Sequence, residues 1–278
     1  MQIRNHTIKK RSILGLFLMA LAAWVILLLI VRTPSNDLVW AADQEILPFA
    51  EFDGDVIHVK NIRNFEYLSR DEYVQNYYDK TVLISDIESV DYIVEPLASV
   101  AVAHTLLSFG LKDGSRIAIS IEIRKEAGEE FSPIKGIFEE YEIMYVVVDE
   151  RDALTLRAVH RDNPVYIYPT VAPKEAVQQL FVNMLERATA LRDTPEFYNT
   201  LTNTCATRIA DHINEIIPSR VGWDYRILLP KDSDLLAYEL GFIDNSIPLD
   251  ELRETYLANE RIKANVDDPN FSVTIREQ

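Results

Sequence analysis

An uncharged run of 19 residues near the N-terminus, Ile13 to Val31, constrains this chain more than any other feature. At a rise of about 1.5 Å per residue, a helix of that length spans roughly 28 Å, close to the ~30 Å hydrocarbon core of a bilayer. Residues 1–32 contain no acid and five cations, at Arg4, Lys9, Lys10, Arg11 and Arg32. Basic residues in front of such a run remain in the cytoplasm, so the sequence predicts one transmembrane helix with the rest of the chain outside.

The same run has a second interpretation as a signal peptide that is cut near Ala41 and Ala42. The apolar region of a signal peptide is normally about 7–15 residues long, so the length favours an uncleaved anchor. The sequence therefore predicts a basic cytoplasmic segment over residues 1–12 and a transmembrane helix over 13–31. A tether over 32–48 and one globular domain over 49–278 are expected to follow.

The part after the anchor is strongly acidic. The chain has 28 Lys and Arg against 44 Asp and Glu, and removing the five cations of residues 1–32 leaves 23 against 44, a charge of −21. A nucleic-acid binder needs a basic stripe, so nucleic acid is excluded as a partner. The single cysteine, Cys205, excludes an internal disulfide and a zinc site built from paired cysteines. No glycine-rich phosphate loop is present, so we expect neither a metal nor a cofactor.

Beyond residue 48 the pattern is mixed, with strands first and helices later. Short β-rich segments predict strands at Val56–Val59, Asn64–Leu68, Val82–Ser85, Tyr92–Glu95, Tyr141–Val148 and Val165–Tyr168. Helical spacing of apolar residues predicts a long helix from Pro173, followed by helices over Asn203–Pro218, Ser233–Leu240 and Leu249–Ala264. This order of elements predicts an α+β fold with an antiparallel sheet and packed helices.

Cys205 is expected in the first turn of a helix. Thr202 or Asn203 can cap that helix, because each side chain accepts hydrogen bonds from free backbone amides. The partial positive charge of a helix start favours a thiolate, which is the nucleophilic form of cysteine. The alternative is a buried cysteine that acts as a small apolar side chain.

A histidine that could serve the thiol lies in an apolar strand. His104 is part of Val100–Gly110, which is predicted to form a hairpin with Ser115–Arg124. A three-residue loop, Lys112-Asp113-Gly114, sets His104 opposite Glu122, where the carboxylate would orient the imidazole as in a catalytic triad. A two-residue Asp113-Gly114 turn would instead set His104 among isoleucines, as a core histidine. The sequence leaves both registers open.

Several stretches resemble the Lnb N-terminal periplasmic domain family. The resemblance covers about residues 60 to 275 and rests on Ala103–Gly110, Ser120–Glu126, Tyr145–Asp152, Tyr198–Thr207, Gly222–Pro230 and Leu236–Gly241. It implies a periplasmic domain held on a bacterial inner membrane by a single span, residues 13–31. It also implies a circularly permuted papain-like fold, in which the histidine strand precedes the cysteine helix.

The resemblance further implies a thiol hydrolase or acyltransferase that acts on an amide or ester of the cell envelope. Cys205 would be the nucleophile, His104 the base and Glu122 the group that orients His104. The family pattern has Asn directly before the cysteine, whereas this chain has Thr204 there and Asn203 one position earlier. These two residues are the candidates for binding the oxyanion or orienting the thiol. Envelope peptides, lipoproteins and lipids are the expected substrates, and a non-catalytic envelope-binding or scaffold domain is the alternative.

Overall fold

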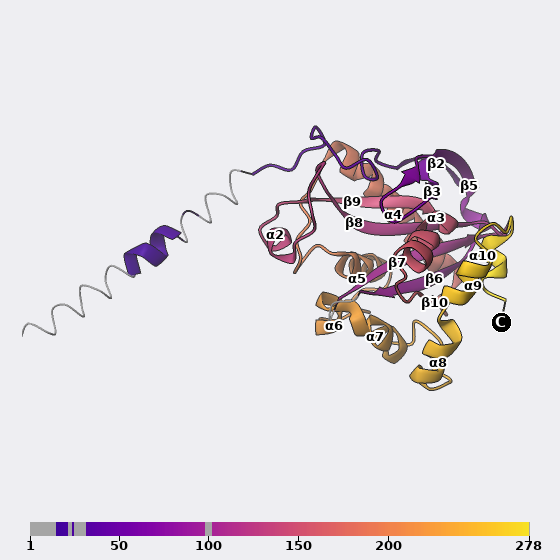
Figure 1. The fold of residues 1–278 in the computed structure, drawn as a ribbon. Helices are drawn as coiled ribbons and strands as arrows, with labels where there is room; N and C mark the ends of the chain where they lie inside the picture. The colour runs from indigo at the N-terminus through magenta and orange to yellow at the C-terminus, as the bar shows by residue number, and fades with distance from the viewer. Residues whose placement is uncertain (1–14, 22–23, 25–31, 98–101, 278) are drawn as a thin grey trace, which may run out of the picture.

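One large sheet organises the globular domain (Figure 1). The computed structural model describes residues 15–21, 24, 32–97 and 102–277. The sheet has eight strands in the order β1-β2-β9-β8-β7-β6-β10, with β5 paired to β2. Their bounds are Phe49–Asp53 for β1, Val56–Arg63 for β2, Tyr77–Leu83 for β5, Ile87–Pro96 for β6, Ala103–Leu111 for β7, Arg116–Arg124 for β8, Glu142–Asp149 for β9 and Tyr166–Pro169 for β10. Every pairing is antiparallel except that of β2 with β9, so the predicted α+β class with an antiparallel sheet is confirmed in outline.

The hairpin of β7 and β8 has the register that the three-residue loop predicts. Leu106 pairs with Ser120 and Gly110 with Arg116, and the same alignment sets His104 opposite Glu122. The Gly114 amide donates to the Leu111 carbonyl at 2.9 Å to close the loop, with Gly114 at φ +82°. That left-handed conformation is one that glycine adopts without steric cost.

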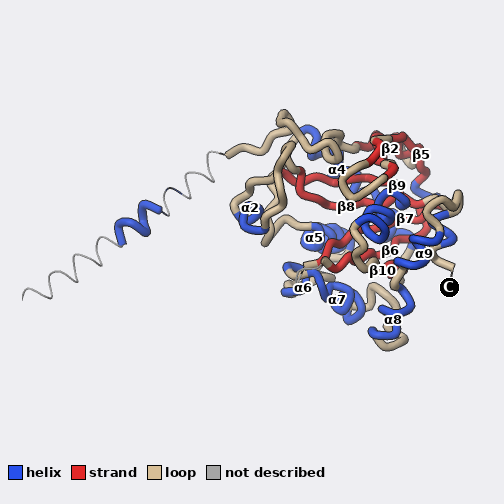
Figure 2. The backbone as a smooth tube through the Cα atoms, viewed as in Figure 1, coloured by secondary structure: helices blue, strands red, loops and turns tan. Residues whose placement is uncertain are grey.

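The two faces of the sheet are covered by different helices (Figure 2). The isoleucines of β8 pack against α4 (Lys174–Asp193) and α5 (Cys205–Ile216). On the other face, Leu106 and Ala118 pack against α3 (Glu150–Thr155), which continues into the π-helical turn η2 (Leu156–His160). The helices α9 (Asn259–Ala264) and α10 (Phe271–Thr274) cover the same face. A third apolar cluster joins β10 to α7 (Ser233–Glu239) and α8 (Leu249–Tyr256).

Several boundaries differ from the sequence-based expectation; the predicted strand Val82–Ser85, for example, is the end of β5 followed by a 3-10 turn, Ile84–Asp86. The predicted helix Leu249–Ala264 is broken into α8 and α9, because the Ala258 amide donates to the Val165 carbonyl beside β10 at 2.8 Å. The predicted strand Asn64–Leu68 is reduced to β3 (Glu66–Tyr67), which pairs only with β4 (Tyr73–Val74) outside the main sheet. The helix expected from Asn203 begins at Cys205, since Thr204 is its cap. Short helices α2 (Pro133–Ile137) and α6 (Tyr225–Leu228) were not expected.

The N-terminal segment is described only in part. Among the described residues, no helix is long and apolar enough to cross a membrane. Most of Ile13–Val31, including both of its ends, lies outside those residues, so the spanning helix stays a prediction. The expected tether, residues 32–48, is attached to the domain from Ser35, whose amide donates to the Glu142 carboxylate at 3.1 Å.

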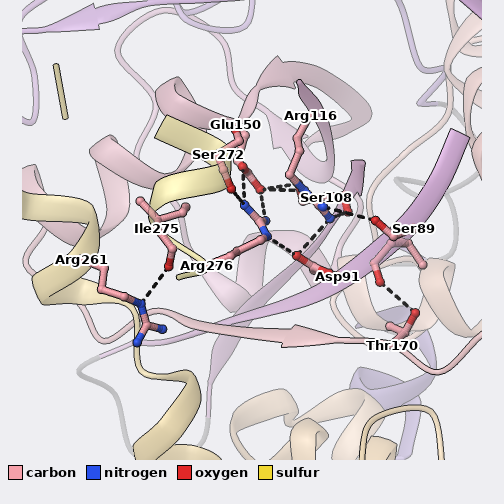
Figure 3. A network of polar contacts seen from close by, with 11 residues as sticks. Ser89, Asp91, Ser108, Arg116, Glu150, Thr170, Arg261, Ser272, Ile275 and Arg276 are labelled. Atoms are coloured by element: carbon pink, nitrogen blue, oxygen red, sulfur yellow. Dashed lines mark hydrogen bonds and ion pairs between the residues drawn. The ribbon is translucent and has the colours of Figure 1, made fainter. Parts of the chain in front are cut away.

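A cluster of buried charges ties the C-terminal segment to the sheet (Figure 3). This C-terminal charge cluster consists of Asp91, Ser108, Arg116, Glu150 and Arg276. Arg276 binds Asp91 at 2.7 Å and Glu150 at 2.9 Å, and Arg116 lies 3.0 Å from Asp91 and 3.3 Å from Glu150. Two guanidinium groups thus face two carboxylates, which gives a neutral, fully paired network in the interior.

Candidate active site

The start of α5 holds Cys205 in a fixed position. Thr204 caps the helix: its hydroxyl accepts from the Thr207 amide at 3.3 Å, and the Thr207 hydroxyl accepts from the Thr204 amide at 2.7 Å. These two bonds form a capping box and use two of the four amides that a helix start leaves free. The amides of Cys205 and Ala206 remain available to another acceptor. Cys205 is buried, with 9% of its surface exposed.

His104, Glu122 and Ser120 form a hydrogen-bonded group on one face of the hairpin. His104 Nε2 lies 3.0 Å from Glu122 Oε1 and 2.6 Å from Ser120 Oγ. The Ser120 hydroxyl donates its hydrogen to Glu122 Oε1 at 2.7 Å, so Nε2 must be the donor toward Ser120. Nε2 therefore carries a proton, and Nδ1 is the nitrogen that could exchange a proton with the thiol.

His104 and Cys205 meet at the beginning of β7, beyond the last pair of the β7–β8 ladder, Leu106 with Ser120. Burial by itself would raise the pKa of the Cys205 thiol. The charge of His104 and a hydrogen bond from its imidazole outweigh burial, with help from the Thr105 hydroxyl and amide, and lower this pKa below its ordinary value. The structure therefore favours a thiolate at Cys205.

The pKa of the His104 imidazole and the pKa of the Glu122 carboxyl are shifted in opposite directions. Burial by itself would lower the pKa of His104, but Glu122 and Cys205 raise it to about 10. For Glu122, burial opposes ionisation, whereas His104 and Arg157 together lower the pKa well below its ordinary range. A thiolate, an imidazolium and a carboxylate are thus the mutually stabilised charge states.

Behind Glu122 lies a second set of charges, which we name the site charge cluster: the buried Glu95 and Arg157, the partly buried Glu122 and the exposed Arg161. Arg157 binds Glu122 at 3.1 Å and Glu95 at 2.9 Å, and Arg161 lies 3.5 Å from Glu95. Two guanidinium groups balance two carboxylates before His104 is counted. A protonated His104 therefore adds an unbalanced positive charge, for which the Cys205 thiolate is the counter-ion.

The structure brings together the three predicted catalytic residues, Cys205, His104 and Glu122, but it gives other contacts to Asn203 and Thr204. The side-chain nitrogen of Asn203, Nδ2, donates to the Phe197 carbonyl at 2.7 Å, and its side-chain oxygen accepts from the Arg208 guanidinium. Thr204 is engaged by the capping box. Both side chains thus hold the start of α5 in place through contacts with residues other than His104.

Sequence reasoning missed Thr105 and Arg157 at this site. Thr105 could have been found, because the strand alternation that sets His104 on one face sets its neighbour on the face of α5. Arg157 carried no such signal, since η2 was not expected and 35 residues separate Arg157 from Glu122. Among the described residues, no group of three or more His, Cys, Asp or Glu side chains is arranged to hold a metal ion.

An apolar cavity begins one residue beyond Cys205. Its volume is about 240 Å³, and Ala, Val, Leu and Ile side chains provide most of its wall. Ala206, Ile209, Ala210 and Ile213 of α5 form one side, and the start of α4 and the helix α7 form others. Tyr92 and Ser233 also line the cavity, and the Tyr92 hydroxyl donates to Ser233 at 2.8 Å. A long apolar group could therefore lie along α5 with its head near the thiol.

The fold and this site define an α+β domain with a cysteine, a histidine and a glutamate gathered at a helix start. The chain belongs to the Lnb N-terminal periplasmic domain family, whose model matches residues 73–231. This match confirms the family resemblance seen in the sequence over residues 73–231 and indicates a protein of the bacterial envelope. No curated protein and no solved structure matches the chain.

Proposed function

We propose that this protein is a thiol acyltransferase or hydrolase that acts on an amide or ester of the bacterial envelope. The observation that carries the proposal is the joint position of Cys205, His104 and Glu122, with an apolar cavity that begins at Ala206, the residue after the cysteine. The chain order, in which the histidine strand precedes the cysteine helix, supports a permuted papain-like arrangement. Residues 13–31 would hold the enzyme on the inner membrane as a single span.

The reaction would begin from the thiolate–imidazolium pair. The Cys205 sulfur attacks the substrate carbonyl, and the amides of Cys205 and Ala206 bind the oxyanion that forms. His104 then gives its Nδ1 proton to the leaving alcohol or amine as the carbon–heteroatom bond breaks. This leaves a thioester on Cys205 and a neutral imidazole that Glu122 keeps oriented.

The second half of the reaction returns the enzyme to its starting state. Water, in a hydrolase, or an amine or alcohol, in an acyltransferase, attacks the thioester while His104 takes its proton. The carbon–sulfur bond breaks, and the thiolate forms again beside the imidazolium. The apolar cavity along α5 supports an acyl chain as the transferred group, because its lining offers few polar partners.

The experiment is capture of the acyl-enzyme. The full chain is mixed with p-nitrophenyl palmitate or p-nitrophenyl acetate, and the intact mass is measured before and after treatment with neutral hydroxylamine, which cleaves thioesters. We expect a palmitoyl adduct on Cys205 that forms faster than the acetyl adduct. The variant Cys205→Ala should form neither.

The variant Ala210→Phe tests whether the cavity holds the acyl chain. Ala210 lines the cavity one turn beyond Cys205, so a larger side chain would occupy the space of the chain. We expect the palmitoyl reaction to slow while the acetyl reaction is unchanged. A protein that binds palmitate but forms no adduct on Cys205 would contradict the catalytic proposal and would favour the alternative, an envelope-binding domain.

A further inference from the structure

Large apolar side chains are exposed around α2, next to the start of α5. We name this surface the α2 face; besides Val39 of the N-terminal segment, it consists of residues from α2 and the loops beside it. Their exposed fractions are 67% for Ile134, 50% for Leu201, 49% for Phe131, 43% for Phe138 and 41% for Ile137. So many exposed apolar side chains within short segments are typical of an interaction surface.

Hydrogen bonds join the parts of the α2 face and connect it to the candidate active site. The Thr200 amide donates to the Gly136 carbonyl at 3.3 Å, and the Thr200 hydroxyl donates to the Pro133 carbonyl at 2.9 Å. A Cβ atom at Gly136 would collide with the Thr200 side chain, so α2 lies directly on this loop. The same loop continues into Thr204 and Cys205, so the nucleophile lies at the border of the α2 face.

The N-terminal segment joins the domain at the same end. The Val39 carbonyl accepts from the Ala127 amide at 2.8 Å, and the Ala41 amide donates to the Lys125 carbonyl at 2.9 Å. Val39 itself is 76% exposed. Both contacts lie in the connection from β8 to α2, and Figure 1 shows the N-terminal segment leaving the domain on the side of α2, away from α10.

The length of the segment limits how far this end of the domain can lie from the proposed anchor. Four residue steps, from Val31 to Ser35, separate the end of the expected span from the contact of Ser35 with Glu142. At no more than about 3.5 Å per residue, they extend about 14 Å. An anchor in residues 13–31 therefore holds the α2 face close to the bilayer surface.

The charges around the α2 face indicate whether it would bind an anionic or a zwitterionic membrane surface. Five glutamates and two lysines lie in residues 125–140, and Lys135 is shared between Glu129 and Glu140 at 3.6 and 4.0 Å. This acidic border would be repelled by anionic headgroups. Attraction to a bilayer must then come from the apolar side chains, as at the interface of a zwitterionic membrane.

We propose that the α2 face docks on the surface of the membrane that holds residues 13–31, so that the start of α5 opens toward the lipid. This inference rests on the proposed membrane anchor but not on the proposed reaction. Docking would let an acyl group pass from the bilayer to Cys205 without crossing water.

The test uses the full chain reconstituted in phosphatidylcholine vesicles. A polarity-sensitive NBD fluorophore is attached to a new cysteine in the Cys205→Ala background, at Ile134→Cys or at Leu201→Cys. The matched control is Val273→Cys on α10, which is 48% exposed but lies at the opposite end of the domain. We expect blue-shifted emission at positions 134 and 201 that brominated acyl chains quench, and neither effect at position 273. Adding anionic lipid should not strengthen the effect.

Three other outcomes would contradict the docking, the anchor or the choice of the membrane as the partner. Equal, unquenched emission at positions 134 and 273, in protein that stays with the vesicles after carbonate washing, would overturn docking but leave the anchor intact. Release of the chain by carbonate, with unshifted emission, would overturn the anchor and docking together. A blue shift that rises with protein density and is not quenched by brominated lipid would assign the α2 face to a second copy of the chain.

Discussion

Two charge clusters lie on the same face of the sheet, a few residues apart along the same strands, yet they differ in what they can do. The C-terminal charge cluster uses Asp91 of β6 and Arg116 of β8, and the site charge cluster uses Glu95 of β6 and Glu122 of β8. Each contains two arginines and two carboxylates. The difference lies on β7, where the first cluster contacts Ser108 and the second contacts His104.

The comparison shows how one titratable group changes the role of an otherwise neutral network. In the C-terminal charge cluster every charge has a partner that keeps its charge at ordinary pH, so the network is a structural link. In the site charge cluster the pairs are complete before His104 is added. The proton on His104 is therefore balanced by the thiolate of Cys205, and the network stabilises a reactive state.

The largest change is expected from Glu150→Ala, in the free energy of unfolding. This change leaves Arg116 and Arg276 buried with one carboxylate between them, which should lower the free energy of unfolding by about 3–5 kcal/mol. Burial alone would raise the pKa of Glu150, but Arg276 and Arg116 lower it to about 2. A depressed pKa means that the stabilisation is present above the unfolded value of about 4.3 and is lost as the pH falls toward 2.

Urea unfolding followed by circular dichroism measures this effect between pH 2 and 7. The difference between native protein and Glu150→Ala should be large at pH 7 and should shrink below about pH 4.3. The control Glu260→Ala changes a side chain that is 92% exposed and should leave the unfolding midpoint in place. Equal midpoints for Glu150→Ala and native protein at pH 7 would show that the C-terminal charge cluster does not stabilise the fold.

A smaller effect is expected when His104→Ala removes the group that distinguishes the two clusters. Cys205 is the single cysteine, so its alkylation by iodoacetamide can be followed without interference. In native protein the lowered thiol pKa means that the thiolate persists to a lower pH than it does for an ordinary cysteine. In His104→Ala burial remains without the imidazolium, so the rate at pH 7 should fall by a few tens of fold.

The pH profile separates this effect from a change in access to the thiol. We expect the native rate to level off at a lower pH than the His104→Ala rate, which should rise up to and beyond pH 8.5, the ordinary range of a free thiol. His58→Ala, which changes another strand histidine, should keep the native profile. Parallel profiles for native protein and His104→Ala would rule out His104 as the partner of the thiol.

The smallest effects are expected from a matched pair of serines. Ser108 donates to Glu150, and Ser120 donates to Glu122 at 2.7 Å, so each serine holds one carboxylate of its cluster. Ser108→Ala should lower the free energy of unfolding by about 1–2 kcal/mol and leave the alkylation rate unchanged. Ser120→Ala should slow alkylation a few-fold. If both variants changed the same measurement alone, the two clusters would not have separate roles.

The site geometry that the sequence could supply came from local rules. Strand alternation and the Lys112-Asp113-Gly114 loop act within about twenty residues and limit the register of His104 and Glu122 to two alternatives, and the strand pairing in the structure decides between them. The helix start at Cys205 was predicted within two residues. The predicted cap, Thr202 or Asn203, was wrong: Thr204 caps the helix, and the Asn203 side chain instead donates to Phe197 and accepts from Arg208.

The remaining features depend on contacts between distant segments, which sequence spacing does not encode. Arg157 joins the site only because η2 packs against the sheet. The break between α8 and α9 depends on a backbone bond from Ala258 to Val165. The cavity likewise forms from helices and strands between Val90 and Phe242, so no single stretch of sequence could indicate it.

The attachment of the N-terminal segment has a mechanical consequence. Asn36 accepts from Arg124 at 2.7 Å, and the Arg124 guanidinium lies 4.0 Å from the centre of the Trp40 ring. Glu122 precedes Arg124 by two residues on β8, a strand paired on both sides. Tension on residues 32–40 is therefore carried into β8 through Arg124. Arg124, which attaches the N-terminal segment, and Glu122, which contacts His104, therefore belong to the same strand.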